Sequence, residues 1–162
     1  MREKEVEDSK HRNSVIVKNN HGVYTRRTYR MSIIEKKNLT VVRKRGNIPK
    51  IPFSKMQEKI LGENYRLTIV FCTPKESKER NRVYRNKNYA TNILSFPLSK
   101  REGEMYISLS VAKKDAKNFS MSYKKFLNLL VIHGMLHLKG MAHGSTMEKL
   151  EAKYLNTFFR GT

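Results

Sequence analysis

The sequence predicts an α+β fold: a single domain with a small mixed four-stranded sheet, packed by about five helices around one long apolar helix. Three observations lead to this prediction. Short runs rich in β-branched and aromatic residues are interspersed with longer stretches of helical periodicity. The chain of 162 residues is long enough for one domain with a substantial core. No internal repeat and no low-complexity linker divides it.

Four segments are predicted to form strands. The clearest is residues 65–72, where apolar and polar residues alternate and the apolar ones then run together, as in a buried strand. Its β-branched and aromatic residues favour the pleated conformation, and Thr73-Pro74 ends it. The other predicted strands are residues 14–18, 93–96 and 104–109.

Helical periodicity predicts the remaining elements. The longest predicted helix covers residues 122–139, with Ser122 as its N-cap. A further helix is expected either at residues 24–37 or at residues 54–61, since the basic segment 23–64 offers little apolar material to decide between them. The other predicted helices are residues 76–84, 111–118 and 147–159.

The ends and the single cysteine predict the organisation of the chain. Residues 1–13 are charged and nearly free of apolar side chains, which predicts a flexible tail before a single domain at residues 14–162. The N-terminus does not resemble a signal peptide, and no apolar run approaches the roughly 20 residues of a membrane span. Cys72 has no partner for a disulfide, which suits a reducing compartment. We therefore expect a cytoplasmic protein with no membrane partner.

The charge balance indicates a polyanionic partner. The chain has 34 Lys and Arg against 14 Asp and Glu, a formal net charge of +20. Nucleic acid fits better than a membrane surface, because no amphipathic basic helix is apparent. The basic segment 23–64 has two interpretations that stay open: a surface that follows phosphates, or a solvated face.

Three histidines form the most informative pattern. His133 and His137 lie four apart on one face of the predicted helix, so both imidazoles point the same way. Gly140 permits a left-handed turn, after which His143 can return to the same point. Lone or paired histidines on an apolar helix are often only core residues, but the third histidine after a glycine favours a metal site. Three imidazoles leave a fourth position of tetrahedral zinc open, as in catalytic sites.

The spacing resembles the metzincin pattern H-E-x-x-H-x-x-G-x-x-H with one difference. Gly134 occupies the place of the glutamate that serves those proteases as general base. Ordinary metalloprotease chemistry therefore lacks its base here, and the sequence favours another way of activating water or a substrate that is not a peptide.

Several motifs together resemble the YbeY family of bacterial endoribonucleases. Residues 133–143 match the family signature H-G-x-L-H-L-x-G-Y-D-H at all three histidines, both glycines and both leucines. Tyr84-Arg85 and then residues 91–97 match Y-R followed by T-[DN]-[VI]-L-S-F-P. Residues 103–108 match G-[DE]-[ILM]-x-[IL]-S. The resemblance runs from about residue 65 to the end of the chain.

This resemblance implies a zinc-dependent endoribonuclease that cuts single-stranded RNA. It implies a role in maturing the 3′ end of small-subunit rRNA and in ribosome quality control, with the small ribosomal subunit and its proteins as partners and no small-molecule cofactor. The implied catalytic residues are Arg85 beside the metal and the ligands of one Zn²⁺, His133, His137 and His143. The ion would polarise a phosphoryl oxygen or acidify water.

One departure from the family pattern bears on the metal. The Tyr-Asp pair before the last histidine is Met141-Ala142 in this chain. A carboxylate at this place would hold a ligand histidine in its tautomer or polarise water, and losing such a group costs about 10–100-fold in metal affinity or activity. A lower metal affinity or rate is therefore expected.

Two other functions remain open on the sequence. The first is a zinc hydrolase of another class, a peptidase or deacylase, that uses Glu104, Glu148 or Glu151 as its base. The second is a ribosome-binding or RNA-binding factor without activity, in which the metal is structural. The basic charge and Gly134 argue against the first, and Ala142 keeps the second open.

Overall fold

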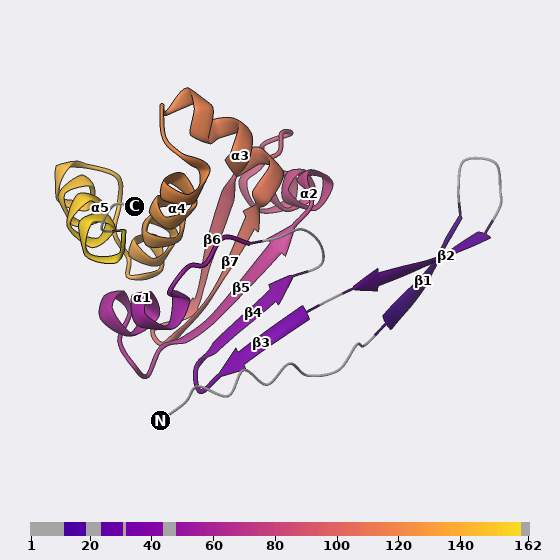
Figure 1. The fold of residues 1–162 in the computed structure, drawn as a ribbon, viewed down its shortest axis with the longest axis horizontal. Coiled ribbons are helices and arrows are strands. Elements are labelled where there is room, and N and C mark those ends of the chain that lie inside the picture. The colour runs from indigo at the N-terminus through magenta and orange to yellow at the C-terminus, as the bar shows by residue number, and fades with distance from the viewer. Residues whose placement is uncertain (1–11, 19–23, 31, 44–47, 160–162) are drawn as a thin grey trace.

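The computed structural model describes residues 12–18, 24–30, 32–43 and 48–159 (Figure 1). Within these ranges five strands form the main sheet and two more form a separate antiparallel pair. The pair is β1 (Arg12–Lys18) and β2 (Tyr24–Arg30). The main sheet contains β3 (Ser32–Lys36), β4 (Leu39–Arg43), β5 (Arg66–Cys72), β6 (Ile93–Ser99) and β7 (Glu102–Ser108).

The main sheet is mixed, with the strand order β3-β4-β5-β7-β6. The central strands β4, β5 and β7 run parallel, whereas the edge strands β3 and β6 each pair antiparallel with their neighbour. β6 is irregular at its end, because the register with β7 shifts between Pro97 and Ser99. The parallel strands are connected through helices, as crossover connections require.

The predicted α+β class is confirmed, but the predicted count of four sheet strands is wrong. β3 and β4 were missed, because they are short and lie in the basic segment that carries little apolar material. The predicted strand at residues 14–18 exists as β1, yet it pairs with β2 and not with the main sheet. The strands predicted at residues 65–72, 93–96 and 104–109 correspond to β5, β6 and β7.

Five helices occur in the described part of the chain: α1 (Phe53–Ile60), α2 (Pro74–Arg85), α3 (Leu109–Asn118), α4 (Tyr123–Leu138) and α5 (Ser145–Phe158). The prediction of a helix at residues 24–37 is wrong, because β2 and β3 occupy that segment. The alternative prediction at residues 54–61 is confirmed as α1. The hydroxyl of Ser122 accepts a hydrogen bond from the backbone N–H of Lys125, so the predicted N-cap is also confirmed. Each of these helices is too short or too polar to cross a lipid bilayer.

Residues 1–11, most of the predicted tail and including His11, lie outside the described residues, as does His21. Arg12 and Asn13, which the sequence placed in the tail, are the first two residues of β1.

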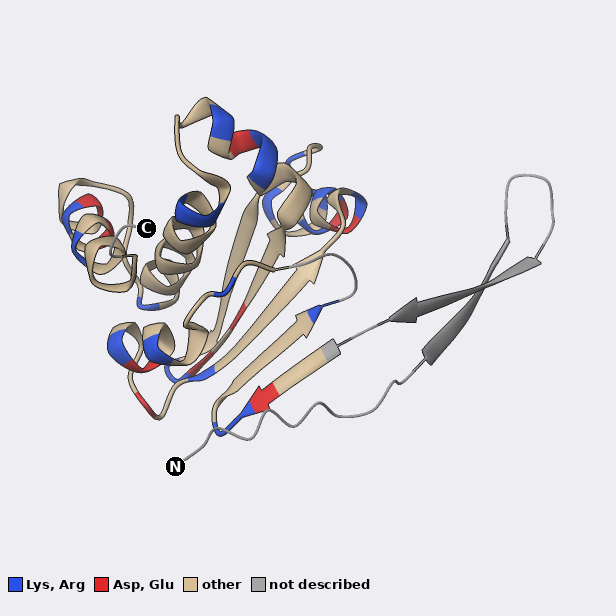
Figure 2. Ribbon diagram, in the orientation of Figure 1, with Lys and Arg blue, Asp and Glu red and all other residues tan. Residues whose placement is uncertain are grey.

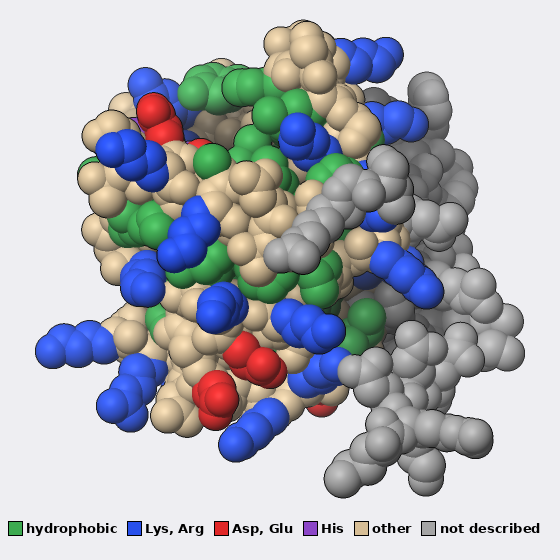
Figure 3. All heavy atoms as spheres, turned by 60° about the vertical axis from the view of Figure 1, so that its left-hand side comes forward, with side chains coloured by type: hydrophobic (Ala, Val, Ile, Leu, Met, Phe, Trp, Pro, Cys, Tyr) green, Lys and Arg blue, Asp and Glu red, His purple; other side chains and the backbone are tan. Residues whose placement is uncertain are grey.

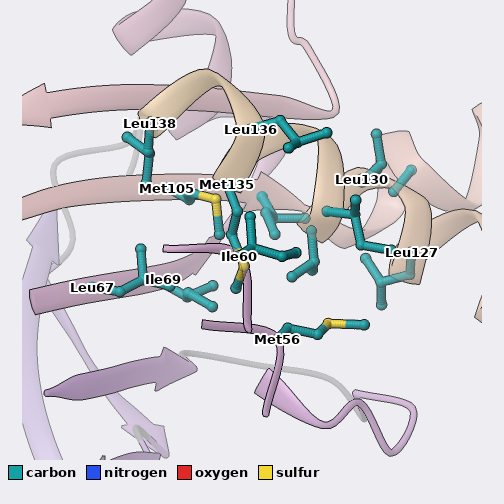
Figure 4. Packing of buried hydrophobic residues seen from close by; sticks show 14 of the residues in the cluster. Met56, Ile60, Leu67, Ile69, Met105, Leu127, Leu130, Met135, Leu136 and Leu138 are labelled. Atoms are coloured by element: carbon teal, nitrogen blue, oxygen red, sulfur yellow. The ribbon is translucent and has the colours of Figure 1, made fainter. Parts of the chain in front are cut away.

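The main core lies between one face of the sheet and α4, which is itself covered on its outer side by α5 (Figure 1). α4 carries buried apolar residues around most of its circumference, because it contacts the sheet, α1, α3 and α5. Met135 of α4, Ile60 of α1 and Ile69 of β5 meet at the centre of this packing (Figure 4).

Successive side chains of β7 point to opposite faces of the sheet, so they contact different helices. Met105 faces α4, because its Sδ lies 2.5 Å from the position that a Cβ on Gly134 would occupy. Tyr106 points to the opposite face, where the guanidinium carbon of Arg80 on α2 lies 3.8 Å from its ring centre. The sheet therefore separates α2 from α4.

Candidate metal centre

The C-terminal half of α4 opens to solvent at only two positions. Every residue from Leu130 to Leu138 is buried except His133 and His137, which are half-buried. The four-residue spacing places both imidazoles on the same strip of the helix. The buried packing on the other sides fixes the direction of this strip, so the two imidazoles face a defined opening.

A turn after α4 brings in the third histidine, as the glycine predicted. Gly140 has φ +90°, a left-handed conformation that favours glycine. The N–H of Gly140 donates to the carbonyl of His137, and the N–H of Met141 donates to the carbonyl of Leu136. The chain therefore reverses at once, and His143 lies beside the two helical histidines.

The three imidazoles lie close enough to hold one metal ion. Their nearest ligand atoms are all within 4.8 Å of one another, and the Nε2 atoms of His133 and His137 are 3.0 Å apart. Bonds of about 2.0–2.1 Å at tetrahedral angles would place such nitrogens about 3.3 Å apart. The residues present therefore fit a metal such as zinc, with one position left for water or substrate.

Hydrogen bonds on the outer nitrogens orient two of the rings. His137 Nδ1 donates to the carbonyl oxygen of Met141 at 2.9 Å, and a carbonyl oxygen can only accept. His133 Nδ1 lies 2.6 Å from Oε1 of Glu151. With the protons on Nδ1, both Nε2 lone pairs point at the shared space.

Burial lowers the pKa of His137 from its usual value, and the neighbouring imidazoles of His133 and His143 lower it further. The hydrogen bond to Met141 and the charge of Glu151 act in the opposite direction but are outweighed. His137 is therefore neutral at neutral pH, which is the state that binds a metal.

Gly134 explains why the metzincin glutamate is absent. A Cβ at this position would lie 2.5 Å from Sδ of Met105, 2.7 Å from Cδ1 of Ile93 and 3.0 Å from Oγ of Ser95. The position faces the sheet and leaves no room for a side chain. A glutamate beside His133 would therefore have to displace the side chains of Met105, Ile93 and Ser95.

Arg85 is the last residue of α2 and is exposed to solvent. Within the part of the chain that the structure describes, its guanidinium makes no hydrogen bond or ion pair. Residues 86–92 connect it to Ile93, the residue at the start of β6 that packs against Gly134. The linker is held in place by hydrogen bonds from Asn81 to the carbonyl of Tyr89 and between Ser77 and Thr91.

The three carboxylates that the sequence offered as bases lie in different places. Glu104 accepts a hydrogen bond from the Tyr106 hydroxyl at 2.7 Å, on the sheet face away from α4. Burial and this hydrogen bond raise the pKa of Tyr106 to about 12, so the hydroxyl stays a donor. Glu148 is exposed on α5. Only Glu151 contacts one of the three histidines.

Sequence reasoning did not find the contacts that orient the imidazoles. Glu151 was considered only as a base, although it lies four residues from both Met147 and Leu155, the buried residues of α5. This spacing signals that Glu151 faces α4. No sequence pattern indicates the contact with the carbonyl of Met141, because every residue type has the same main-chain oxygen.

A ladder of aromatic rings covers the β6–β7 edge on the face that carries α2. The Tyr84 and Phe96 ring centres are 4.8 Å apart, and those of Phe96 and Tyr106 are 5.9 Å apart. Arg80 closes the inner end above Tyr106. Tyr84, at the outer end, is 62% exposed. Phe96 is half-buried between the two tyrosines, so Tyr84 offers the free ring surface.

Comparison with known proteins gives one consistent result. The family model described as Endoribonuclease YbeY matches residues 34–158, which include every element from β4 to α5 and all three histidines. Three curated relatives named Endoribonuclease YbeY come from Staphylococcus carnosus, Alkaliphilus metalliredigens and Nautilia profundicola. They are 33%, 34% and 37% identical to this chain over 113, 101 and 91 residues.

These alignments cover 62%, 56% and 54% of this chain, and 73%, 63% and 66% of the relatives. Among solved structures, the solution structure of a Thermotoga maritima protein superposes with a TM-score of 0.51 at 26% identity. That match covers 67% of this chain and 79% of the other.

Proposed function

Because the chain belongs to the YbeY family, described as Endoribonuclease YbeY, we propose that it is a zinc-dependent endoribonuclease that cuts single-stranded RNA. Its proposed role is the maturation of the 3′ end of small-subunit rRNA and ribosome quality control, in the cytoplasm and in contact with the small ribosomal subunit. The rRNA and ribosome part rests on the family resemblance.

The observation that carries the proposal is the convergence of three imidazoles at one partly open point. His133, His137 and His143 would hold the ion, and no fourth protein ligand is grouped with them in the described part of the chain. An open fourth position distinguishes catalytic zinc sites from closed structural ones. When bound, the ion supplies Lewis acidity for the phosphodiester and for attacking water.

The Lys and Arg side chains of the protein would bind the RNA backbone. Lys and Arg occur along each of the five described helices (Figure 2). On the face in Figure 3 they stand at intervals, with hydrophobic side chains between them and few acids. A dispersed basic surface of this kind suits a long polyanion that is held at many phosphates.

The structure disfavours the alternative of a zinc peptidase or deacylase. The place of the metalloprotease base is closed by the packing at Gly134. Glu104 is engaged with Tyr106 on the other face of the sheet, and Glu151 is engaged with His133. Phosphodiester cleavage does not depend on a glutamate beside the first ligand, so RNA fits this site better than a peptide does.

The proposal is tested by incubating zinc-loaded protein with an end-labelled single-stranded RNA and with the same RNA annealed to its complement. We expect cuts in the single strand, none in the duplex, and none after the metal is removed with EDTA. Binding that survives EDTA, without cleavage by the zinc-loaded protein, would instead support the RNA-binding factor with a structural metal.

We expect Arg85→Ala to lower the rate of RNA cleavage by about 10²-fold, the loss that follows removal of one donor to a developing charge. This role of Arg85 rests on the family motif, because no hydrogen bond or ion pair joins it to the three histidines in the described part of the chain. The planar fork of Arg85 is exposed and unpaired among the described residues, so it can bind two phosphate oxygens. Single-turnover cleavage measures the effect. Arg82→Ala is the matched control, because Arg82 is on the same helix but is paired with Glu79 at 2.7 Å. Equal rates for both variants would remove Arg85 from the site.

We expect Tyr84→Ala to weaken the binding of single-stranded RNA by about 1–3 kcal/mol, the contribution of one base stacked on an aromatic ring. Phe96 supports the inner side of the Tyr84 ring and leaves its outer side to solvent. Fluorescence anisotropy with a labelled oligonucleotide measures the change. Tyr84→Phe keeps the ring and should bind like the wild type. An affinity unchanged in Tyr84→Ala would show that no base stacks there.

A further inference from the structure

A carboxylate from a different helix contacts the metal centre. Oε1 of Glu151 on α5 lies 2.6 Å from Nδ1 of His133 on α4. Both side chains are largely shielded, with 18% of the glutamate and 24% of the histidine exposed. The contact therefore lies in the seam between the two helices and not on the open surface.

The packing of α5 holds Glu151 in this position. Met147 and Leu155 are the buried residues of α5, and Glu151 lies midway between them at four-residue steps. The same strip of the helix thus carries both apolar anchors and the carboxylate. Glu148, one turn earlier, is exposed and does not share this environment.

The contact determines which nitrogen of His133 carries the proton. A neutral imidazole carries its proton on either nitrogen, and a proton on Nε2 would block metal binding there. A carboxylate at Nδ1 keeps the proton on the outer side. The Nε2 lone pair then points toward Nε2 of His137, 3.0 Å away.

No other carboxylate does this in the described part of the chain. The residue before His143, where the family signature has aspartate, is Ala142, which is exposed. His137 is oriented by the backbone carbonyl of Met141. Among the described residues, Glu151 is the carboxylate that is hydrogen-bonded to a proposed ligand.

We propose that Glu151 is a positioning residue of the metal centre, which sets the tautomer and orientation of His133 and so raises metal affinity. This inference rests on the proposed function only in that the three histidines bind a metal. Glu151 acts through His133 and is not the general base. The docking of α5 onto α4 is therefore part of the metal site.

The test is zinc affinity, measured by competition with a chromophoric chelator for the wild type, Glu151→Ala, Glu151→Gln and Glu148→Ala. We expect Glu151→Ala to weaken zinc binding by about 10–100-fold. Glu151→Gln keeps the size and an acceptor oxygen, so its loss should be smaller. Glu148→Ala should bind like the wild type. The visible spectrum of the Co²⁺ form should change in Glu151→Ala and stay unchanged in Glu148→Ala.

Thermal unfolding of the metal-free variants shows whether α5 still docks, and Glu151→Gln carries the test if the alanine variant does not fold. Equal zinc affinity for the wild type and every folded Glu151 variant would overturn the proposal, as would a wild type that does not bind zinc. The readout does not involve RNA. If zinc affinity depends on Glu151 but the wild type cuts no RNA, the inference stands and the endoribonuclease proposal fails.

Discussion

Replacing His137 with alanine is expected to eliminate RNA cleavage and to weaken metal binding by more than the roughly 10–100-fold that follows loss of an orienting partner. His137 is the central ligand of the three. Its ring centre is 4.5 Å from that of His133 and 4.6 Å from that of His143. Without it two imidazoles remain, fewer than the three protein ligands of catalytic zinc sites.

Cleavage of labelled RNA and chelator competition measure the two effects of His137→Ala. The variant must be purified in the same way as the wild type, because trace ribonuclease would cut RNA in both preparations. Glu148→Ala serves as a matched control with a changed but uninvolved surface. RNA cleavage by His137→Ala at the wild-type rate would show that the three histidines do not carry the reaction.

Replacing Gly134 with alanine is expected to destabilise the fold by about 1–3 kcal/mol, the usual cost of overpacking a core. Alanine would gain up to about 1 kcal/mol of helix propensity over glycine, so the steric cost must exceed this. The new methyl would lie 2.5 Å from the Met105 sulfur and 2.7 Å from Cδ1 of Ile93. Urea denaturation of the metal-free protein measures the change in the free energy of unfolding.

A double-mutant cycle shows whether the sulfur is the obstacle. Met105→Ala removes it at a cost of its own, since this side chain is fully buried. If the new methyl at Gly134 collides with Met105, the double variant will lose less unfolding free energy than the two single variants lose together. Additive losses, or a Gly134→Ala protein more stable than the wild type, would contradict the proposed close approach of α4 to the sheet.

The convergence of the three histidines could be predicted from the sequence because its pattern is local. His133 and His137 are related by helix geometry, and His143 follows through one glycine turn. The long helix was equally predictable, since its apolar periodicity and its cap at Ser122 are both contained in one segment.

The features that escaped prediction depend on contacts distant in the sequence. Glu151 is eighteen residues from His133, and only the packing of α5 on α4 brings the two together. The strands β3 and β4 were missed for a different reason. β4 alternates, with Leu39 and Val41 buried on either side of Thr40, but five residues between basic segments make this pattern too short to stand out. β3 exposes both Ile33 and Ile34 and so lacks the alternation that identifies a half-buried strand.

Both edges of the main sheet discourage pairing with a second copy of the chain. β6 includes Pro97, which has no N–H to donate, and its register with β7 is interrupted there. β3 is only five residues long and carries Glu35 and Lys36. Short, charged or interrupted edges prevent sheets from adding to one another and aggregating. Such protection has particular value in a strongly basic protein, because a long RNA gathers many copies at high local concentration, where exposed edges would otherwise join.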